Sequence, residues 1–299
     1  MRLTLRQLSI FVAVADTGST SAAGVRIALS QSATSGALSE LEALLHARLF
    51  DRVGKRLVLN DNGRSLLPQV RELLDAAQEI ESMFVADRLG GAVGRLRVGA
   101  STTIGNYLLP ALVASHERAW PASVVDVRID NTQAISSAVA RLEVDLGLIE
   151  GPCHEPTLAV VPWWQDELVI VAAADDALAL VARRSPLDAT SLRAARWLQR
   201  EPGSGTREAV EQALLPHLHH LDRVTQFGST EAIKNAAAEG MGLACVSLCT
   251  VQDLVTLGRL VVLPTALPRL VRQFYLVRHR QKHLSANLRR FCVHIGVEP

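Results

Sequence analysis

The spacing of apolar positions changes twice along the chain, and each change marks a different kind of structure. Up to about residue 63 the apolar residues recur at helical intervals within short segments. From residue 64 to 88 they recur in alternating steps of four and three, and beyond residue 95 they form short runs between helical segments. The pattern predicts a small domain over residues 1–63, a linker helix over 64–90 and a larger α/β domain over 91–299.

Within the first part, residues 18–64 have the layout of a helix-turn-helix. Hydroxyl residues at positions 19–21, which favour helix caps, open a short helix that reaches about Ala28. A tight connection at Leu29-Ser30 leads to a second helix that starts near Gln31 and carries leucines on one face. In this motif the second helix enters the major groove of DNA. The plain alternative is an ordinary helical subdomain with a solvated polar face.

Polar and basic side chains accompany the second helix. Its predicted exposed side carries a glutamine, which can pair with an adenine edge, and hydroxyls, which suit bases or phosphates. Residues 52–64 predict a β-hairpin wing with basic residues near its tip. Residues 1–65 hold eight basic and five acidic side chains, a positive excess in a chain of net charge +1. The predicted DNA-binding residues are Gln31, Ser32, Thr34, Ser35, Arg52, Lys55 and Arg56.

The linker predicts a dimer seam. Residues 64–88 contain no glycine and a single proline, Pro68, near the start. Their apolar positions fall on the a and d sites of a coiled coil, which would pair two reading heads on a palindromic site. The alternative is a long helix packed on its own domain. Glycines 90, 91 and 94 then break the helix. The seam positions are Leu66, Val70, Leu73, Ala77, Ile80 and Phe84.

From Arg95 onward, strands and helices alternate, which predicts a parallel sheet with helices on both faces. A first set of elements ends near residue 150, and Leu168–Ala174 begins a second set. A last strand at Arg272–Val277 and a helix from about Ser285 are expected to return to the first set. The result is a two-lobed clamp of the periplasmic-binding-protein type. Lobe I spans about 91–163 and 267–299, and lobe II about 164–266.

Three polar segments follow strands or precede helices of this domain, at positions 101–103, 131–132 and 202–206. Ligands of open α/β sheets bind at the carboxyl ends of strands, and free N–H groups at helix starts suit anions. Glycines 203 and 205 would let the backbone close on a ligand. For each segment the alternative is plain N-capping. The predicted effector-binding residues are Ser101, Thr102, Thr103, Thr132, Glu150, Arg200, Gly203, Ser204, Gly205, Thr206 and Thr230.

Arg200 is open to two interpretations. Its guanidinium can pair bidentately with an oxyanion. It can equally form a structural salt bridge with Glu201 or Glu231.

The strings FVAVADTGS, ALSQSATSGALSELE and LFDRVGKRLVLNDNGRSLLP carry a family resemblance. The run from Leu5 to Leu67 resembles the N-terminal domain of LysR-type transcriptional regulators, and length and layout agree across nearly all of the chain. The resemblance implies a winged helix-turn-helix, a long dimerisation helix and a two-lobed effector domain. It places bases near Gln31, Ser32 and Thr34, and phosphates near Ser35 and Arg52. Gly24 departs from the family's usual alanine, and close helix packing would explain it.

The strings STTIGNYLLP, REPGSGTRE and GSTEAIK resemble one branch of that family, which contains YeiE-like and sulfur- or carbon-assimilation regulators. The resemblance implies a small anionic effector, such as a sulfur oxyanion or a phosphorylated or carboxylated metabolite. The hydroxyl-rich, aromatic-poor site agrees with a small anion rather than an aromatic acid. Expected partners are promoter DNA and a second copy of the chain, with a tetramer as the larger assembly and RNA polymerase as a possible contact.

Other functions fit the residues less well. An enzyme is disfavoured because no phosphate-binding glycine motif and no nucleophile elbow occur, and Ser204 has no activating partner in the sequence. A transporter's solute-binding protein would leave the first 90 residues without a role. No metal is expected, because His217, His219 and His220 fit a polar helix end better than zinc. Cys245 and Cys249 are read as small buried thiols rather than a redox switch.

Length and composition agree with a folded cytoplasmic regulator. At 299 residues, the chain is long enough for two or three domains, and 48% hydrophobic residues support packed cores. Its apolar runs are too short to span a membrane. Residues 1–15 superficially resemble a signal peptide, but their apolar positions also fit one buried helix face, and that interpretation is preferred.

Overall fold

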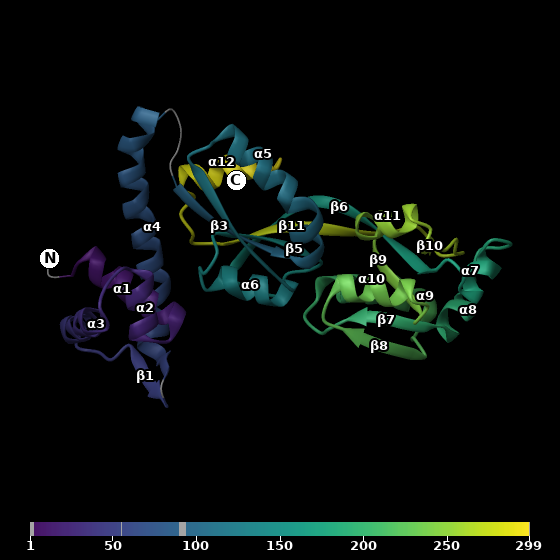
Figure 1. The fold of residues 1–299 in the computed structure, drawn as a ribbon, viewed down its shortest axis with the longest axis horizontal. Coiled ribbons are helices and arrows are strands. Elements are labelled where there is room, and N and C mark those ends of the chain that lie inside the picture. Colours follow the sequence, from purple (N-terminus) through teal and green to yellow (C-terminus); the bar gives the residue numbers. More distant parts are fainter. Residues whose placement is uncertain (1–2, 55, 90–93, 299) are drawn as a thin grey trace. The chain divides into compact units, whose positions relative to one another are not determined.

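The structure, a computed structural model, describes residues 3–54, 56–89 and 94–298. It divides into two compact units, Met1–Gly94 and Arg95–Pro299, and each unit is described by itself (Figure 1). Among the described residues no single helix is both long and apolar enough to cross a membrane. The first two helices together have the length and apolar character, but the chain bends by 119° between them.

The first unit is a winged helix-turn-helix. Hydroxyl side chains of Thr4, Ser19 and Ser30 cap the first three helices by accepting hydrogen bonds from backbone N–H groups one turn ahead. Phe11 and Leu41 are fully buried and hold the unit's core together. The predicted helix-turn-helix and wing are confirmed. The elements are α1 (Leu5–Thr17), α2 (Thr20–Arg26), α3 (Gln31–Leu45), β1 (Phe50–Val53) and β2 (Arg56–Leu59).

Helices α2 and α3 approach each other at Gly24. A Cβ atom there would lie 2.7 Å from the Leu29 carbonyl oxygen and 3.0 Å from the Thr34 Oγ1. The predicted reason for this glycine, close helix packing, is therefore confirmed. The same contact corrects a prediction: Thr34 was expected on the exposed side of α3, but it is fully buried and its hydroxyl donates to the Ser30 carbonyl.

The long helix α4 (Asp61–Leu89) starts three residues before the predicted start of the linker. Its first turns pack on their own unit, where Leu67 and Val70 are buried. Farther along, Leu73 and Ile80 are 48% and 60% exposed. The beginning of α4 thus follows the packed-helix alternative, while these two seam positions stay accessible. The side chain of Phe84 and the glycines 90 and 91 lie outside the described residues.

An ion-pair triad ties α4 to the reading head. The Asp16 carboxylate of α1 accepts from Arg71 of α4 at 2.5 Å and from Arg26 of α2 at 3.0 Å. Arg71 is buried, and its guanidinium charge is compensated in part by this carboxylate. The orientation of α4 is therefore coupled to α1 and α2.

The second unit is built on one mixed sheet, in the order β4-β3-β5-β11-β6-β9-β7-β8, with β10 paired to β6. β3 pairs with β5, and β7 with β8 and β9, in parallel. β11 and β6 run antiparallel to their neighbours, so the expected all-parallel sheet is wrong for these two strands. The strands are β3 (Gly94–Ser101), β4 (Ser123–Asp130), β5 (Leu146–Glu150), β6 (Leu158–Ala173), β7 (Arg196–Arg200), β8 (Arg223–Phe227), β9 (Leu243–Ser247), β10 (Leu260–Val262) and β11 (Leu270–His279).

Strands β6 and β11 cross between two lobes (Figure 1). On β6, Trp163 packs against the core of lobe I and Leu168 belongs to the core of lobe II. On β11, Leu270 belongs to lobe II and Phe274 to lobe I. The two-lobed fold class is confirmed, and the last strand and helix return to lobe I as predicted.

The helices divide between the lobes as follows. Lobe I carries a π-helical turn, η1 (Ile104–Leu108), and the helices α5 (Leu109–Ala119), α6 (Thr132–Ala140) and α12 (Ala286–His294). Lobe II carries α7 (Ala177–Ala182), α8 (Ala189–Ala194), α9 (Gly205–Leu218), α10 (Thr230–Ala238) and α11 (Leu248–Thr256).

Replacing Gly24 with alanine is expected to destabilise the first unit by about 1–3 kcal/mol, because the added methyl overlaps the Leu29 carbonyl. Native-state hydrogen exchange of the α2 and α3 amides measures this free energy. Gly36→Ala is the matched control, because nothing lies within 4 Å of its Cβ position. That change is expected to stabilise α3 by roughly 0.5–1 kcal/mol. Equal effects of the two substitutions would contradict the packing explanation.

Candidate functional site

The first turn of α3 presents two of the predicted DNA-binding side chains. Gln31 and Ser32 are exposed, and Ser35, one turn on, is partly exposed. The Gln31 Nε2 donates to the Thr20 Oγ1 at 3.4 Å, and the Ser32 Oγ lies 3.0 Å from the Ser30 Oγ. These weak, exposed contacts leave both side chains able to meet a groove. Thr34 does not join them, because it is buried.

The wing adds positive charge. Arg52 on β1 and Arg56 on β2 are exposed and lie in adjacent pairs of the hairpin ladder. Within the described residues neither arginine forms an ion pair, whereas Arg48 pairs with Glu42 at 2.8 Å. Unpaired arginines can neutralise phosphates. Lys55, the third predicted wing residue, lies outside the described residues.

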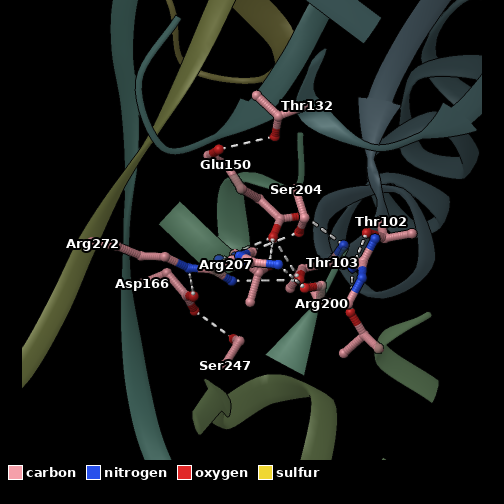
Figure 2. A network of polar contacts seen from close by, with 12 residues as sticks. Thr102, Thr103, Thr132, Glu150, Asp166, Arg200, Ser204, Arg207, Ser247 and Arg272 are labelled. Carbon is pink, nitrogen blue, oxygen red and sulfur yellow. Dashed lines mark hydrogen bonds and ion pairs between the residues drawn. The ribbon is translucent and has the colours of Figure 1, made fainter. Parts of the chain in front are cut away.

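In the second unit, a buried carboxylate organises the lobe junction. Glu150 ends β5, and its Oε1 accepts from the Thr103 backbone N–H at 2.6 Å. Its Oε2 accepts from the hydroxyls of Thr103 and Thr206 and from Arg272, at 2.9, 2.5 and 3.0 Å (Figure 2). Burial alone raises the pKa of Glu150, but the Arg272 charge and these hydrogen bonds outweigh it and hold the pKa below its usual value.

Arg272 links this carboxylate to the crossing strands. Its Nε donates to the Asp166 Oδ2 at 2.7 Å, so an arginine of β11 pairs with an aspartate of β6. The Ser247 hydroxyl donates to the other oxygen of Asp166 at 2.6 Å. Sequence reasoning missed these three residues. The available signal was a charged residue on the inward face of a strand. Arg272 lies two positions before buried Phe274, so the two side chains point to the same face of β11.

Arg200, at the end of β7, brings hydroxyls of both lobes together. Its Nε and Nη2 donate to the Glu201 carboxylate at 2.8 and 2.9 Å. Its Nη1 donates to the Thr102 Oγ1 of lobe I at 2.7 Å and to the Thr230 Oγ1 of lobe II at 2.8 Å (Figure 2). Of the two salt bridges left open by the sequence, the one with Glu201 forms.

A hydroxyl that accepts from arginine keeps its own proton for another acceptor. Among the described residues, neither Thr102 nor Thr230 uses that proton. The nearby Ser101 hydroxyl is buried and forms no hydrogen bond of normal geometry with the described residues, but it lies close enough to Glu150 to help lower the pKa of that carboxyl. The junction can therefore donate hydrogen bonds to a small group with acceptor oxygens.

The other predicted residues are occupied by structural contacts within or between the lobes. Ser204 caps α9 by accepting from the Arg207 N–H, which is the N-capping alternative. Thr132 donates to the Glu150 carbonyl at 2.9 Å. A Cβ on Gly205 would lie 1.5 Å from that same carbonyl oxygen, and one on Gly203 would lie 2.5 Å from the Gln133 Oε1. At both glycines the missing side chain makes room for the opposite lobe.

A second polar bridge lies beside the first. Tyr107 of η1 in lobe I donates to Glu231 of α10 in lobe II and accepts from the Lys234 Nζ at 3.0 Å. Lys234 is buried and also contacts Asp253 at 3.2 Å. Burial and the Glu231 contact raise the pKa of Tyr107 to about 12, so it stays a neutral phenol. No sequence pattern connects Tyr107 with Glu231 or Lys234, because these residues lie more than 120 positions apart.

The cysteines and histidines were candidates for a redox switch or a metal site. All four cysteines are free, and burial raises the pKa of Cys245 to about 12. Cys249 is partly buried beside the Ser247 hydroxyl. Among the described residues no group of three histidine, cysteine or acidic side chains could hold a metal ion.

Two family descriptions match the chain. Residues 5–64 match the bacterial regulatory helix-turn-helix proteins of the lysR family, and residues 89–296 match the LysR substrate binding domain. The chain belongs to the LysR family of transcriptional regulators. As a LysR-type protein it is a DNA-binding regulator with an effector-binding domain and not an enzyme, which confirms the prediction from sequence.

Similar proteins agree with this assignment. The HTH-type transcriptional regulator YeiE of Escherichia coli K12 is 46% identical over 97% of this chain and 96% of its own length. Full-length OxyR from Pseudomonas aeruginosa shares the fold with a TM-score of 0.74 at 22% identity, over 99% of this chain and 93% of that one. The CcmR regulatory domain of Synechocystis, solved in complex with 2-PG, is 32% identical, with a TM-score of 0.61 over 68% of this chain and 95% of that one.

Replacing Arg272 with leucine is expected to destabilise the effector-binding unit by about 3–5 kcal/mol, because Glu150 would keep a buried charge without its partner. Thermal unfolding followed by tryptophan fluorescence measures the loss, since all four tryptophans lie in this unit. Arg269→Leu is the matched control, because the Arg269–Glu167 pair is exposed and screened by solvent, so its loss should change the unfolding temperature little. Similar losses in both variants would contradict the role given to burial.

Proposed function

We propose that this LysR-type regulator reads promoter DNA with Gln31, Ser32, Ser35, Arg52, Lys55 and Arg56, and responds to a small oxyanion bound at the lobe junction. The candidate effector groups are the hydroxyls of Ser101, Thr102 and Thr230 together with Arg200. Binding between the lobes would change their relative orientation and, through it, the arrangement of the DNA-reading units. The ligand must favour one lobe arrangement over the other for this coupling to work.

One observation carries the effector part of the proposal: a single arginine donates to hydroxyls from both lobes. A ligand at this point touches lobe I and lobe II at once, so its binding energy can change their equilibrium. The hydroxyl protons left over on Thr102 and Thr230 match acceptor oxygens. The CcmR domain bound to 2-PG supports a small-molecule effector for this fold.

The DNA part rests on the exposed start of α3 and the unpaired arginines of the wing. Exposed Leu73 and Ile80 on α4 support a homodimer that would pair two reading heads. A tetramer through the effector domains and contact with RNA polymerase are further parts of the proposal. The site of action is the cytoplasm, where promoter DNA is found.

Replacing Gln31 with alanine is expected to weaken binding to an operator selected from a random library by about 1–3 kcal/mol, and binding to unrelated DNA much less. Fluorescence anisotropy with the two duplexes measures both affinities. Gln69→Ala, an exposed glutamine of α4, is the control. Equal losses on operator and unrelated DNA would refute base reading by Gln31.

Replacing Arg52 with alanine is expected to weaken binding to both duplexes alike. The slope of log affinity against log salt should fall by about 1, because one phosphate contact is lost. The same anisotropy measurement, repeated at several salt concentrations, tests this. An unchanged slope would show that Arg52 does not contact DNA.

Replacing Ser101 with alanine, or Thr102 with valine, is expected to remove the effector response while the protein still folds, because each change removes a hydroxyl donor without adding bulk. A thermal-shift screen of oxyanions and small carboxylates identifies ligands, and the two variants are then tested with each hit. Thr190→Val, an exposed threonine of α8, is the control. Hits that survive both substitutions would place the effector elsewhere.

A further inference from the structure

Two groups of contacts cross between the lobes of the effector-binding unit, and they differ in charge. The first group lies at the start of α9, where the Thr206 hydroxyl donates to the buried carboxylate of Glu150 at 2.5 Å. At the same place the Gly205 backbone lies against the Glu150 carbonyl. Lobe I therefore contributes a buried negative charge to these contacts. Hydrogen bonds to a buried charge are among the stronger ones, and losing one leaves the charge less well compensated.

The second group lies at the start of α10, where lobe I contributes neutral side chains. The Thr102 hydroxyl accepts from Arg200 at 2.7 Å (Figure 2). The Tyr107 hydroxyl accepts from the Lys234 Nζ at 3.0 Å and donates to Glu231. The Lys234 Nζ also lies 5.5 Å from the centroid of the Tyr107 ring. The phenol is neutral, since the pKa of Tyr107 is raised to about 12.

The cations at α10 keep their charged partners if the lobes separate there. Arg200 pairs with Glu201 of its own lobe at 2.8 Å. Lys234 pairs with Glu231 at 3.0 Å and with Asp253 of α11 at 3.2 Å, and both carboxylates also belong to lobe II. Opening at α10 would therefore break hydrogen bonds to neutral side chains of lobe I without separating these ion pairs. The side chains of Glu231 and Asp253 are 45% and 59% exposed, so water can replace the lost partners at small cost.

We propose that the lobes open asymmetrically, with the α9 contacts as the pivot and the contacts of Tyr107 with Glu231 and Lys234 as a latch that is released. The inference rests on the proposed function, since it describes the lobe movement that effector binding would control. Thr230, a candidate effector hydroxyl, is the first residue of α10. Release of the latch would therefore carry Thr230 away from Thr102 of lobe I, and a ligand that bridges the two hydroxyls would oppose it.

Distances across the two ends of the junction test this proposal without any effector. Double electron–electron resonance is measured on the full chain, with doubly labelled protein diluted into unlabelled protein so that distances within one chain dominate. The partly exposed Cys153 and Cys249 are first replaced by serine. One label pair joins η1 to α10 and the other joins α6 to α9, at the exposed or partly exposed positions Asn106 and Asn235, and Ser137 and Gln212.

Tyr107→Phe removes the latch hydroxyl and keeps the ring. It is expected to raise the population with a lengthened η1–α10 distance by about three- to tenfold, while the α6–α9 distance stays unchanged. Tyr275→Phe is the matched control, because it removes the other of the chain's two tyrosine hydroxyls. Within the described part of the chain, that half-buried residue of β11 forms no hydrogen bond between the lobes. Both distances should be unchanged in the control.

Thr206→Val tests the pivot. It removes a donor from the buried Glu150 carboxylate and should lower the thermal unfolding temperature by more than Tyr107→Phe does. The η1–α10 distance should stay as in the unmodified protein, because the latch is intact.

The latch and the effector site fail in different ways. Equal lengthening of both distances in Tyr107→Phe would show that the lobes separate as a whole, and would overturn the asymmetric opening. No lengthening at η1–α10 would show that Tyr107 does not hold the lobes, and would overturn it as well. Neither result bears on the effector hydroxyls, which Ser101→Ala and Thr102→Val test separately. Effector binding that survives those two changes would refute the site and leave the measured latch in place.

Discussion

The buried ion pair between Glu150 and Arg272 is the interaction on which the effector-binding unit depends. Glu150 ends a strand of lobe I, Arg272 lies on one crossing strand, and Asp166 lies on the other. Neither charge of the central pair would be stable alone, because both side chains are almost fully buried. Thr103 and Thr206 complete the network from lobe I and lobe II. One carboxylate therefore links both lobes and one of the strands that join them.

This network also explains why the candidate effector groups lie where they do. Glu150 accepts hydrogen bonds from the backbone N–H of Thr103 and from the hydroxyls of Thr103 and Thr206. These are groups that the sequence predicted to bind the effector. The donors left for a ligand are those around Arg200 and Ser101. The buried Glu150 carboxylate therefore lies beside the groups proposed to bind the effector.

Much of the fold could be predicted because its signals are local. Caps at Ser19 and Ser30 mark helix starts, and apolar spacing marks the helices that follow. The strand from Leu158 to Ala173 was predicted only in its second half, because Pro162 and the polar residues after it hide the alternation. Thr34 was placed wrongly, since the spacing alone cannot show that Gly24 leaves room for its side chain.

For the candidate site, the sequence indicated which polar side chains gather but not how they pair. Strand ends and helix starts indicated where polar side chains would gather, and Thr102, Arg200 and Thr230 do meet there. The carboxylate partners of Arg272 could not be found, because they lie more than 100 positions away and reach it only through the sheet. In the sequence alone, a charged residue that faces inward on a strand cannot be told from one on the surface, because the neighbouring strand is not known.

The backbone of Gly205 in lobe II lies against the Glu150 carbonyl of lobe I. The two lobes can approach this closely only because glycine has no side chain. The Cβ atom of any other residue at this position would overlap the Glu150 carbonyl oxygen. The separation of the two lobes at this point is therefore set by the absence of one carbon atom.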